Sequence, residues 1–240
     1  MNGMIDVHCH ILPGVDDGAE SMNEAFKLLR MEYDQGVRAV ILTPHYRLGY
    51  FETERDEVKE KFRELESRLR SVGVYIQILL GCEFHRTQNM AELIRTNKAY
   101  TMAGSDYVLV EFSRSDTFEI IKKTVSELLL HGFRPIIAHV ERYSALRSMR
   151  KIRYMINSGA YIQVNAGSIL GKEGICRKRF TRKLLREGYI HLIGSDAHDL
   201  RRRSPCMGEC ETFLKHKIGN SETRRLLVEN PLKILKNEYI

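Results

Sequence analysis

The sequence lacks several features that would define a protein class at once. No stretch approaches the ~18 apolar residues of a membrane span, and residues 1–6 show no secretory leader pattern. The five cysteines form an odd set without a C-x-x-C pair, which suits a reducing compartment better than a disulfide framework. We therefore expect free thiols, a cytoplasmic location and no membrane insertion.

Features of nucleic-acid-binding proteins are also scarce. The sequence has no tryptophan, no aromatic-rich basic strand and no recognition-helix motif, although its net charge is +7. The basic excess is concentrated in residues 172–186 and 201–203. Such charge fits an acidic or phosphorylated partner and fits a merely solvated basic face equally well, because net charge governs association rather than chemistry. We expect no nucleic-acid partner.

Short apolar runs alternate with longer amphipathic stretches along the whole chain. This alternation is typical of repeated β–α units around a parallel sheet. Strands are predicted at residues 5–8, 39–43, 75–81, 107–112, 135–139, 161–165 and 190–195. Helices are predicted at residues 21–35, 54–71, 89–95, 117–131, 144–158, 177–187, 210–217 and 221–236. Seven units without a Pro- or Ser-rich linker favour one closed, barrel-like α/β domain over residues 1–240, although a doubly wound open sheet fits the same pattern.

Several predicted helix boundaries carry their own markers. Ser21 followed by Glu24 reads as a capping box at a helix start. Glycine stands where four helices should stop, at Gly36, Gly132, Gly159 and Gly188. These markers support the β–α count independently of the apolar pattern.

Histidine, aspartate or glutamate residues follow almost every predicted strand. The exception is the sixth predicted strand, residues 161–165, which no such residue follows. In a parallel barrel these strand ends meet at the catalytic face, so the side chains should converge. The nine candidates are His8, His10, Asp17, His45, Glu83, Glu111, His139, Asp196 and His198. Nine ligands are too many for one tetrahedral ion, so we expect several ions bridged by carboxylates such as Glu83.

The H-x-H pair at the first strand is the most visible of these features. Because strand side chains alternate, His8 and His10 should face one way while Val7 and Cys9 face the other. Alone, such a pair could equally be structural. The same two-residue spacing recurs in Asp196 and His198, after the last predicted strand. The candidates therefore offer both nitrogen and oxygen ligands, a mixture that suits Mn, Fe or Zn. Ion clusters of this kind catalyse in-line displacement at phosphorus, which predicts phosphoester hydrolysis.

Glu83 and Glu111 have an ordinary alternative reading, in which each ends its strand and pairs with an arginine. Both follow apolar runs, so their carboxylates should be partly desolvated and should need a cation. We therefore favour metal ligation for both.

Together these residues resemble a known family, the PHP superfamily, named for polymerase and histidinol phosphatase, and in particular its bacterial protein tyrosine phosphatases. The resemblance spans nearly the whole chain. The segments that carry it are residues 5–10 (IDVHCH), 15–18 (VDDG), 43–45 (TPH), 81–83 (GCE), 110–112 (VEF), 138–143 (AHVERY), 163–165 (QVN) and 195–198 (SDAH).

The resemblance implies a distorted (β/α)7 TIM-like barrel with a centre of three ions, usually manganese. It assigns the first ion to His8, His10, Glu83 and Asp196. It assigns the second to Glu83, Glu111 and His139, and the third to Asp17, His45 and His198. The implied mechanism is attack on phosphorus by a hydroxide that bridges the ions.

The resemblance also implies a phosphate-binding role and a substrate. Arg142 and Arg203 match positions that contact the phosphate, for which a planar guanidinium is suited. Arg203 lies in a triple arginine run that a solvated turn would explain equally well. The implied substrate is phosphotyrosine on the tail of a bacterial tyrosine autokinase that controls capsular or extracellular polysaccharide synthesis.

Rival interpretations remain. Residues 176–182 satisfy the C-x5-R pattern of cysteine-dependent phosphatases, but such a loop favours glycines around the phosphate and this one is crowded with long side chains. Histidinol-phosphate phosphatases and polymerase-associated exonucleases use similar clusters, and the Asp16–Gly18 and Glu141–Tyr143 segments disfavour both. Cys9 stands where the family more often has serine, and it replaces no ligand.

Overall fold

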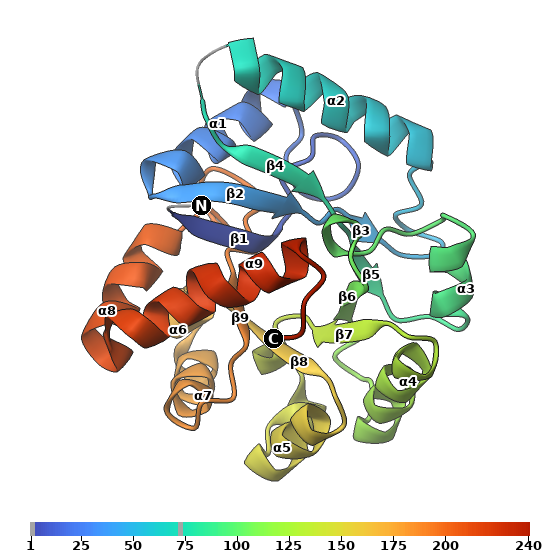
Figure 1. The fold of residues 1–240 in the computed structure, drawn as a ribbon, viewed down its shortest axis with the longest axis vertical. Coiled ribbons are helices and arrows are strands. Elements are labelled where there is room, and N and C mark those ends of the chain that lie inside the picture. Colours follow the sequence, from blue (N-terminus) through green and yellow to red (C-terminus); the bar gives the residue numbers. More distant parts are fainter. Residues whose placement is uncertain (1–2, 72–73) are drawn as a thin grey trace.

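The fold is an α/β arrangement of parallel strands with helices around them (Figure 1). The computed structural model describes residues 3–71 and 74–240. One sheet has the order β1-β2-β4, formed by β1 (Met4–Cys9), β2 (Val37–Leu42) and β4 (Gln77–Leu80). The other has the order β3-β5-β6-β7-β8-β9, formed by β3 (His45–Tyr46), β5 (Glu83–His85), β6 (Tyr107–Glu111), β7 (Arg134–Ile137), β8 (Tyr161–Asn165) and β9 (Leu192–Gly194). The predicted parallel α/β class is confirmed.

Two of the predicted strand regions are broken in the structure. After β2 ends at Leu42, β3 begins at His45, and Pro44 lies in the gap, where it has no N–H to donate. After β4 ends at Leu80, β5 begins at Glu83. β3 pairs with β5 in the same way as β2 pairs with β4, so the second sheet continues the first beyond the break. Together the two sheets form one curled array of parallel strands.

The first and last strands approach each other. Cys9 and Ala197 form an isolated parallel bridge, in which the His10 N–H donates to the Ala197 carbonyl at 2.8 Å. The Asp196 N–H donates to the His8 carbonyl at 2.7 Å. The segment that follows β9 is thus held against the end of β1.

Most helices lie where the sequence predicts them. The α-helices are α1 (Met22–Asp34), α2 (Arg55–Ser71), α3 (Met90–Arg95), α4 (Phe118–Leu130), α5 (Met149–Asn157), α6 (Ala166–Leu170), α7 (Ile175–Arg186), α8 (Met207–Arg224) and α9 (Asn230–Leu235). Short 3-10 helices are η1 (Met102–Gly104), η2 (Val140–Arg142) and η3 (Ser144–Leu146), and η4 (Arg225–Glu229) is π-helical. The helix predicted from residue 144 begins as an α-helix only at Met149, because η3 occupies its start. α6 was not predicted.

The predicted boundary markers are present. Ser21 Oγ accepts from the Glu24 N–H at 3.2 Å at the start of α1. Glu24, however, accepts from the Glu20 N–H rather than closing the box on Ser21. The break predicted between residues 217 and 221 is a kink within α8 at Gly219, whose φ of 80° favours glycine.

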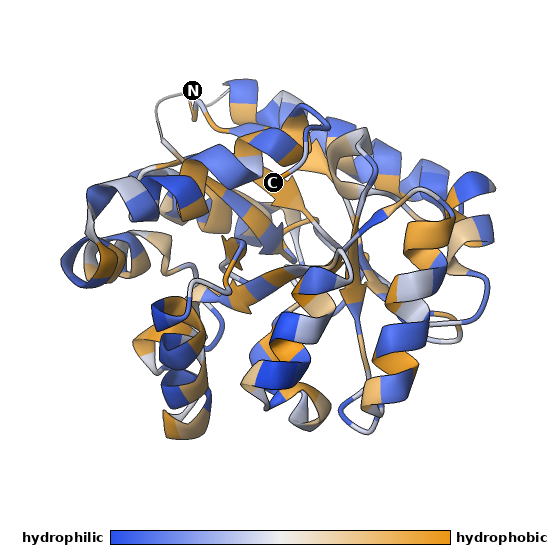
Figure 2. Cartoon of the chain, turned by 60° about the horizontal axis from the view of Figure 1, so that its bottom comes forward, coloured by the Kyte–Doolittle hydropathy of each residue, from blue (hydrophilic) through white to orange (hydrophobic). Residues whose placement is uncertain are grey.

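Apolar side chains form two buried clusters. The smaller one consists mainly of strand residues, including Ile5 and Val7, and is closed by Met102 of η1 and Ile234 of α9. The larger one lies between the strands and the surrounding helices. Figure 2 shows the apolar colouring concentrated on the central strands, while the helices carry both apolar and polar residues. Within the described ranges, no helix is both long and apolar enough to cross a membrane.

The strict alternation expected along β1 is wrong at its end. Val7 packs in the smaller cluster and Cys9 in the larger one, so they do not share a face. The register of β1 against β2 shifts between Asp6 and Cys9, which turns the strand as it leaves the sheet. His8 and His10 still converge, although the register of β1 shifts between Asp6 and Cys9 and the strand is not ideally pleated there.

Candidate metal centre

The nine predicted ligand residues converge, although not all of them end a strand: His45 and Glu83 begin the short strands β3 and β5, and Asp17 lies in the loop after β1. They form four overlapping groups, and within each group the ligand atoms lie within 4.8 Å of one another. The groups are His10, Asp17, His45 and His198; His8, Glu83 and His139; His8, His10 and Asp196; and His45, Glu83 and Glu111. Residues from the first and last parts of the chain therefore share one cluster, which we call the ligand cluster.

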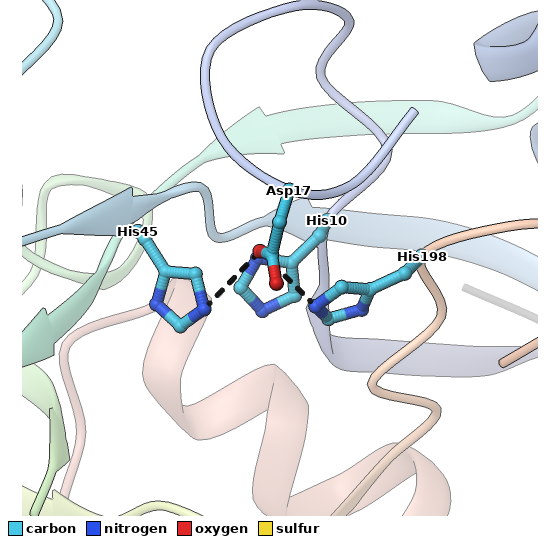
Figure 3. A group of neighbouring side chains, drawn as sticks. All are labelled: His10, Asp17, His45 and His198. Atoms are coloured by element: carbon cyan, nitrogen blue, oxygen red, sulfur yellow. Dashed lines mark ion pairs between the residues drawn. The ribbon is translucent and has the colours of Figure 1, made fainter. Parts of the chain in front are cut away.

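One group is drawn in Figure 3. Asp17, from the loop between β1 and α1, lies between two imidazoles: its Oδ1 is 3.5 Å from His45 Nε2 and 3.6 Å from His198 Nε2. His10 lies beside them, with its ring centroid 3.9 Å from that of His198. Four side chains from distant parts of the sequence thus point toward one small volume.

Glu83 occupies the middle of the ligand cluster. Its Oε2 is 3.2 Å from His8 Nε2 and 3.1 Å from His10 Nε2. It is also 3.2 Å from His45 Nδ1, and Oε1 is 2.6 Å from His139 Nε2. Burial raises the pKa of Glu83, but His8, His45 and His139 outweigh it and hold that pKa well below its usual range. A buried carboxylate among four imidazoles is placed as a bridging ligand would be.

Oxygen acceptors hold the outer ring nitrogens of three histidines. His10 Nδ1 is 2.7 Å from Asp16 Oδ2, and His198 Nδ1 is 3.0 Å from the Asp196 carbonyl. His8 Nδ1 is 3.4 Å from Gln163 Oε1. A proton donated through Nδ1 leaves the Nε2 lone pair directed into the cluster, as in metal sites.

Two buried ring nitrogens support the same interpretation. His45 Nδ1 and His198 Nε2 are buried and make no hydrogen bond within the described residues, although carboxylate oxygens of Glu83 and Asp17 lie 3.2 Å and 3.6 Å away. Leaving a buried polar atom unpaired is costly, about 1–3 kcal/mol. A cation held by these imidazoles and the neighbouring carboxylates would remove that cost, so the donor set fits divalent metal ions.

The charges within the cluster compete. Burial lowers the pKa of His10, but Asp16 and Glu83 outweigh it and raise that pKa to about 10. Burial, assisted by Arg142, lowers the pKa of His139 to about 4. Burial and the negative charge of Glu83 raise the pKa of Glu111 to about 8. The pKa of each group thus follows its burial and the sign of the charge nearest to it.

Both predicted arginines contact the same ligand carboxylate. Arg142 Nη2 is 2.6 Å from Asp196 Oδ2, and Arg203 Nη2 is 2.7 Å from Asp196 Oδ1. Arg142 also lies 3.3 Å from Glu173. Burial raises the pKa of Asp196, but Arg142, His8 and Arg203 hold it well below its usual range. The two guanidinium groups thus stand at the edge of the ligand cluster.

The backbone is unusual at two ligand positions. His139 and Asp196 have φ angles of 29° and 54°, a region in which residues other than glycine are strained. The His139 N–H donates to Gln163 Oε1, and Asn165 Nδ2 donates to Asp196 Oδ2 at 2.8 Å. Side-chain amides of β8 therefore support both strained residues.

A cavity of about 220 Å³ opens onto the cluster. Its lining comprises Asp17, His45, Arg47, Phe51, Glu83, Glu111, Arg142 and Arg203. We call Arg47, Arg142 and Arg203 the arginine wall. The Phe51 ring lies nearly parallel to that of His45, with centroids 5.4 Å apart. Negative ligands, cations and an aromatic side chain thus surround one small space.

A larger cavity of about 670 Å³ lies between α3 and α4, and none of the nine candidates lines it. Size alone would select that cavity, whereas the chemistry selects the smaller one.

Sequence reasoning assigned no role to several residues of the site, although Asp16, Gln163 and Asn165 lie in segments that carry the resemblance. Asp16 supports His10, and its Oδ2 also accepts from the His45 N–H at 2.9 Å. Gln163 and Asn165 end the sixth predicted strand, which has no acid or histidine. Their alternation on a strand that ends at the same face was the available signal. Arg47 and Phe51 follow β3 in a turn that the apolar pattern did not mark.

The cysteine pattern lies outside this site. Cys176 is exposed near the start of α7, and Cys176 and Arg182 belong to one continuous helix rather than to a phosphate-binding loop. The rejection of the C-x5-R interpretation is therefore confirmed. All five cysteines are free, as predicted, and Cys9 is buried among apolar residues.

Comparison with solved structures supports the same architecture. The chain matches a structure from a crystallographic study of YwqE from Bacillus subtilis and CpsB from Streptococcus pneumoniae, which that study calls unique metal-dependent tyrosine phosphatases. The TM-score is 0.92 at 30% identity, covering 99% of this chain and 96% of the other. A phosphotriesterase homology protein from Escherichia coli matches with a TM-score of 0.61 at 14% identity, which shows a shared fold only.

Comparison with curated proteins gives the family. Tyrosine-protein phosphatase CpsB of Streptococcus agalactiae serotype V (strain ATCC BAA-611 / 2603 V/R) is 34% identical over 243 residues, covering 99% of this chain and all of the relative. Tyrosine-protein phosphatase YwqE of Bacillus subtilis (strain 168) is 31% identical over 238 residues, covering 99% of this chain and 93% of the relative. Residues 4–236 match the family model for capsular polysaccharide synthesis, CpsB/CapC. The chain belongs to the CpsB/CapC family.

Proposed function

We propose that this chain is a metal-dependent tyrosine-protein phosphatase. The observation that carries the proposal is the ligand cluster itself: nine converging histidine and carboxylate side chains lie beside an arginine wall. Its relatives CpsB and YwqE are named tyrosine-protein phosphatases. A cluster that binds cations, next to guanidinium groups that bind anions, is suited to a phosphate ester.

We propose that the cluster holds three ions, manganese first, with iron or zinc as alternatives. His8, His10, Glu83 and Asp196 would hold one. Glu83, Glu111 and His139 would hold the second, and Asp17, His45 and His198 the third. When bound, such ions lower the pKa of water and neutralise phosphate oxygens. The proposal is supported by the unpaired His198 Nε2, which lies 3.6 Å from Asp17, and by the central position of Glu83.

The arginines would bind and orient the phosphate. Arg142 and Arg203 both line the cavity. Arg142 Nε is buried and has no hydrogen-bond partner among the described residues. Asp196 and Glu173 both contact Nη2, so the other N–H groups of the guanidinium are left as donors for a phosphate oxygen. Among the described residues, Asp196 is the carboxylate that pairs with Arg203, which would assist from the more exposed side.

Phe51 gives the cavity an apolar side. Its ring stacks on His45, so the imidazole backs it while its position in the cavity lining leaves it available to a substrate. Aromatic rings pair with energies of about 0.5–1.5 kcal/mol beyond their area burial. The phenyl ring of phosphotyrosine would pack there, which favours an aryl over an alkyl phosphate.

The first experiment measures hydrolysis of a phosphotyrosine peptide, histidinol phosphate and single-stranded DNA side by side. Each is assayed with chelator-treated protein and after addition of Mn, Fe or Zn. The expected result is peptide hydrolysis that disappears on chelation and returns with metal. Elemental analysis of the purified protein identifies the ions. Undiminished hydrolysis in metal-free protein would contradict the proposal.

Finer features are proposed with it. We propose a single domain in which the two sheets form one distorted (β/α)7 barrel, supported by the Cys9–Ala197 bridge between its first and last strands. We propose a phosphotyrosine substrate on a bacterial tyrosine autokinase that controls capsular or extracellular polysaccharide synthesis, supported by the family's role in capsular polysaccharide synthesis. A cytoplasmic location is supported by five free cysteines.

A further inference from the structure

Positive charge is segregated in one part of the chain. Residues 147–186 contain eleven lysines and arginines and one acidic residue, Glu173. Because the whole chain has a net charge of +7, the remaining residues together are net negative. The segment runs from the start of α5 through β8 and α6 to the end of α7. Its basic residues are therefore a local feature and not a property of the whole surface.

The two main helices of this segment lie side by side. Figure 1 places α5 next to α7, and Arg153 Nε of α5 donates to the Tyr189 hydroxyl, just beyond α7, at 2.7 Å. Arg150 in the first turn of α5 is exposed, as are Arg179 and Lys183 on α7. Side chains of one sign are thus presented together from neighbouring helices.

Few of these charges are neutralised within the protein. Glu173 accepts from Arg142 and Arg177, and Lys172 pairs with Glu209 at 2.6 Å. No ion pair involves the other nine basic residues within the part of the chain that the structure describes. They are Arg147, Arg150, Lys151, Arg153, Lys178, Arg179, Arg182, Lys183 and Arg186, and we call them the α5–α7 basic surface.

This surface is connected to the cavity. Arg142 lines the cavity and shares Glu173 Oε2 with Arg177 of α7, at 3.3 Å and 2.9 Å. Because η2, which contains Arg142, also contacts α7, the start of that helix lies next to the cavity rim. A peptide leaving the cavity on this side would pass from Arg142 toward the first turn of α7, where Arg177 shares Glu173 with Arg142.

We propose that the α5–α7 basic surface binds acidic residues that flank the phosphotyrosine of the protein substrate. The proposal rests on the proposed phosphatase function. Charge complementarity favours an anionic partner, and continuity with a cavity-lining arginine favours a partner that enters the cavity. A lipid surface or a nucleic acid would need the charge but not that continuity.

The experiment compares three substrates of the metal-loaded enzyme. They are p-nitrophenyl phosphate, a phosphotyrosine peptide with acidic flanks, and the same peptide with neutral flanks. The test variant is Arg150→Glu/Arg179→Glu. We expect it to lower kcat/KM for the acidic peptide about tenfold, through KM, because attraction becomes repulsion. Turnover of p-nitrophenyl phosphate and of the neutral peptide should stay within about twofold.

Two control variants isolate the effect. Lys27→Glu/Arg63→Glu makes the same charge change at exposed positions on α1 and α2, on the other side of the molecule, and should keep the peptide preference (Figure 1). Arg150→Lys/Arg179→Lys should keep it as well, because the charge is retained. In the wild-type enzyme, high ionic strength should reduce the preference.

Several outcomes overturn the inference. Equal turnover of the two peptides by the wild-type enzyme does so, as does an equal loss on both peptides in the test variant. A preference that survives charge reversal while binding to phosphatidylserine vesicles or single-stranded DNA is lost would assign the surface to those partners instead. If the wild-type enzyme hydrolyses none of the three substrates, the proposed function itself fails.

Discussion

The ligand cluster and the arginine wall face each other across one cavity but are built differently. His8 and Glu83 are fully buried within β1 and β5, where neighbouring strands fix their positions. The wall residues lie in loops or 3-10 turns, and the side chains of Arg142 and Arg203 are 18% and 36% exposed. The ligand cluster is thus positioned mainly by the strands, whereas the arginine wall is positioned by the loops and turns that follow them. The cluster should determine whether chemistry occurs, and the wall which phosphate ester is used.

The largest effect is expected at Glu83. Glu83→Gln keeps the side-chain shape but removes the charge that faces four imidazoles. Loss of a bridging ligand should cost several kcal/mol of transition-state stabilisation, which is roughly a thousandfold in kcat. Measurement of kcat for p-nitrophenyl phosphate, together with elemental analysis, tests this. Full metal content and normal kcat would show that the cluster does not depend on its central carboxylate.

The next effect concerns the wall. Arg142→Lys should lower kcat/KM about 10- to 100-fold, because a compact ammonium lacks the planar fork that can hold Asp196 and Glu173 on one side and donate to a phosphate on the other. Arg203→Lys should lower it less, since this guanidinium contacts Asp196 alone and is more exposed.

The two lysine variants are compared at equal metal content. If Arg203→Lys proves the more damaging change, the order assigned to the two guanidinium groups is wrong. If either variant loses metal, that arginine belongs functionally with the ligand cluster.

A smaller effect is expected from the aromatic side of the cavity. Phe51→Ala should raise KM for phosphotyrosine peptide about three- to tenfold, as loss of one ring contact predicts, with kcat little changed. The readout is the ratio of kcat/KM for phenyl phosphate to that for an alkyl phosphate. Tyr75→Ala is a suitable control, because Tyr75 is 82% exposed and does not line the cavity. An unchanged ratio would remove Phe51 from substrate recognition.

The smallest effect lies outside both regions. Cys176→Ser should leave kcat and metal content unchanged, since Cys176 is exposed on α7 and does not line the cavity. Complete loss of activity with intact metal binding would instead support thiolate chemistry and undo the comparison.

The strand-end acids and histidines could be predicted because parallel strands bring their C-terminal ends to one face, so position in sequence translates into position in space. His8 and His139 follow this rule directly, whereas Glu83 begins the short strand β5 after the break that follows β4. Side-chain direction was less predictable: the register shift in β1 separates Val7 from Cys9, and such shifts leave no mark in the apolar pattern.

Supporting residues were harder to predict than ligands. Gln163 and Asn165 act through hydrogen bonds to His8, His139 and Asp196, and amides carry no charge that would single them out. The short helix α6 and the breaks after β2 and β4 depend on tertiary packing, which outweighs local preference over so few residues.

The contact between the ends of β1 and β9 has a thermodynamic consequence. His8 and His10 belong to the first strand region and Asp196 follows the last, so an ion shared by these three would join both ends of the sheet. Such an ion binds only when the chain has folded from residue 8 to residue 196, and its binding free energy is then added to the free energy of unfolding. The ion would act as a reversible cross-link, and metal supply would set the thermal stability of the whole chain.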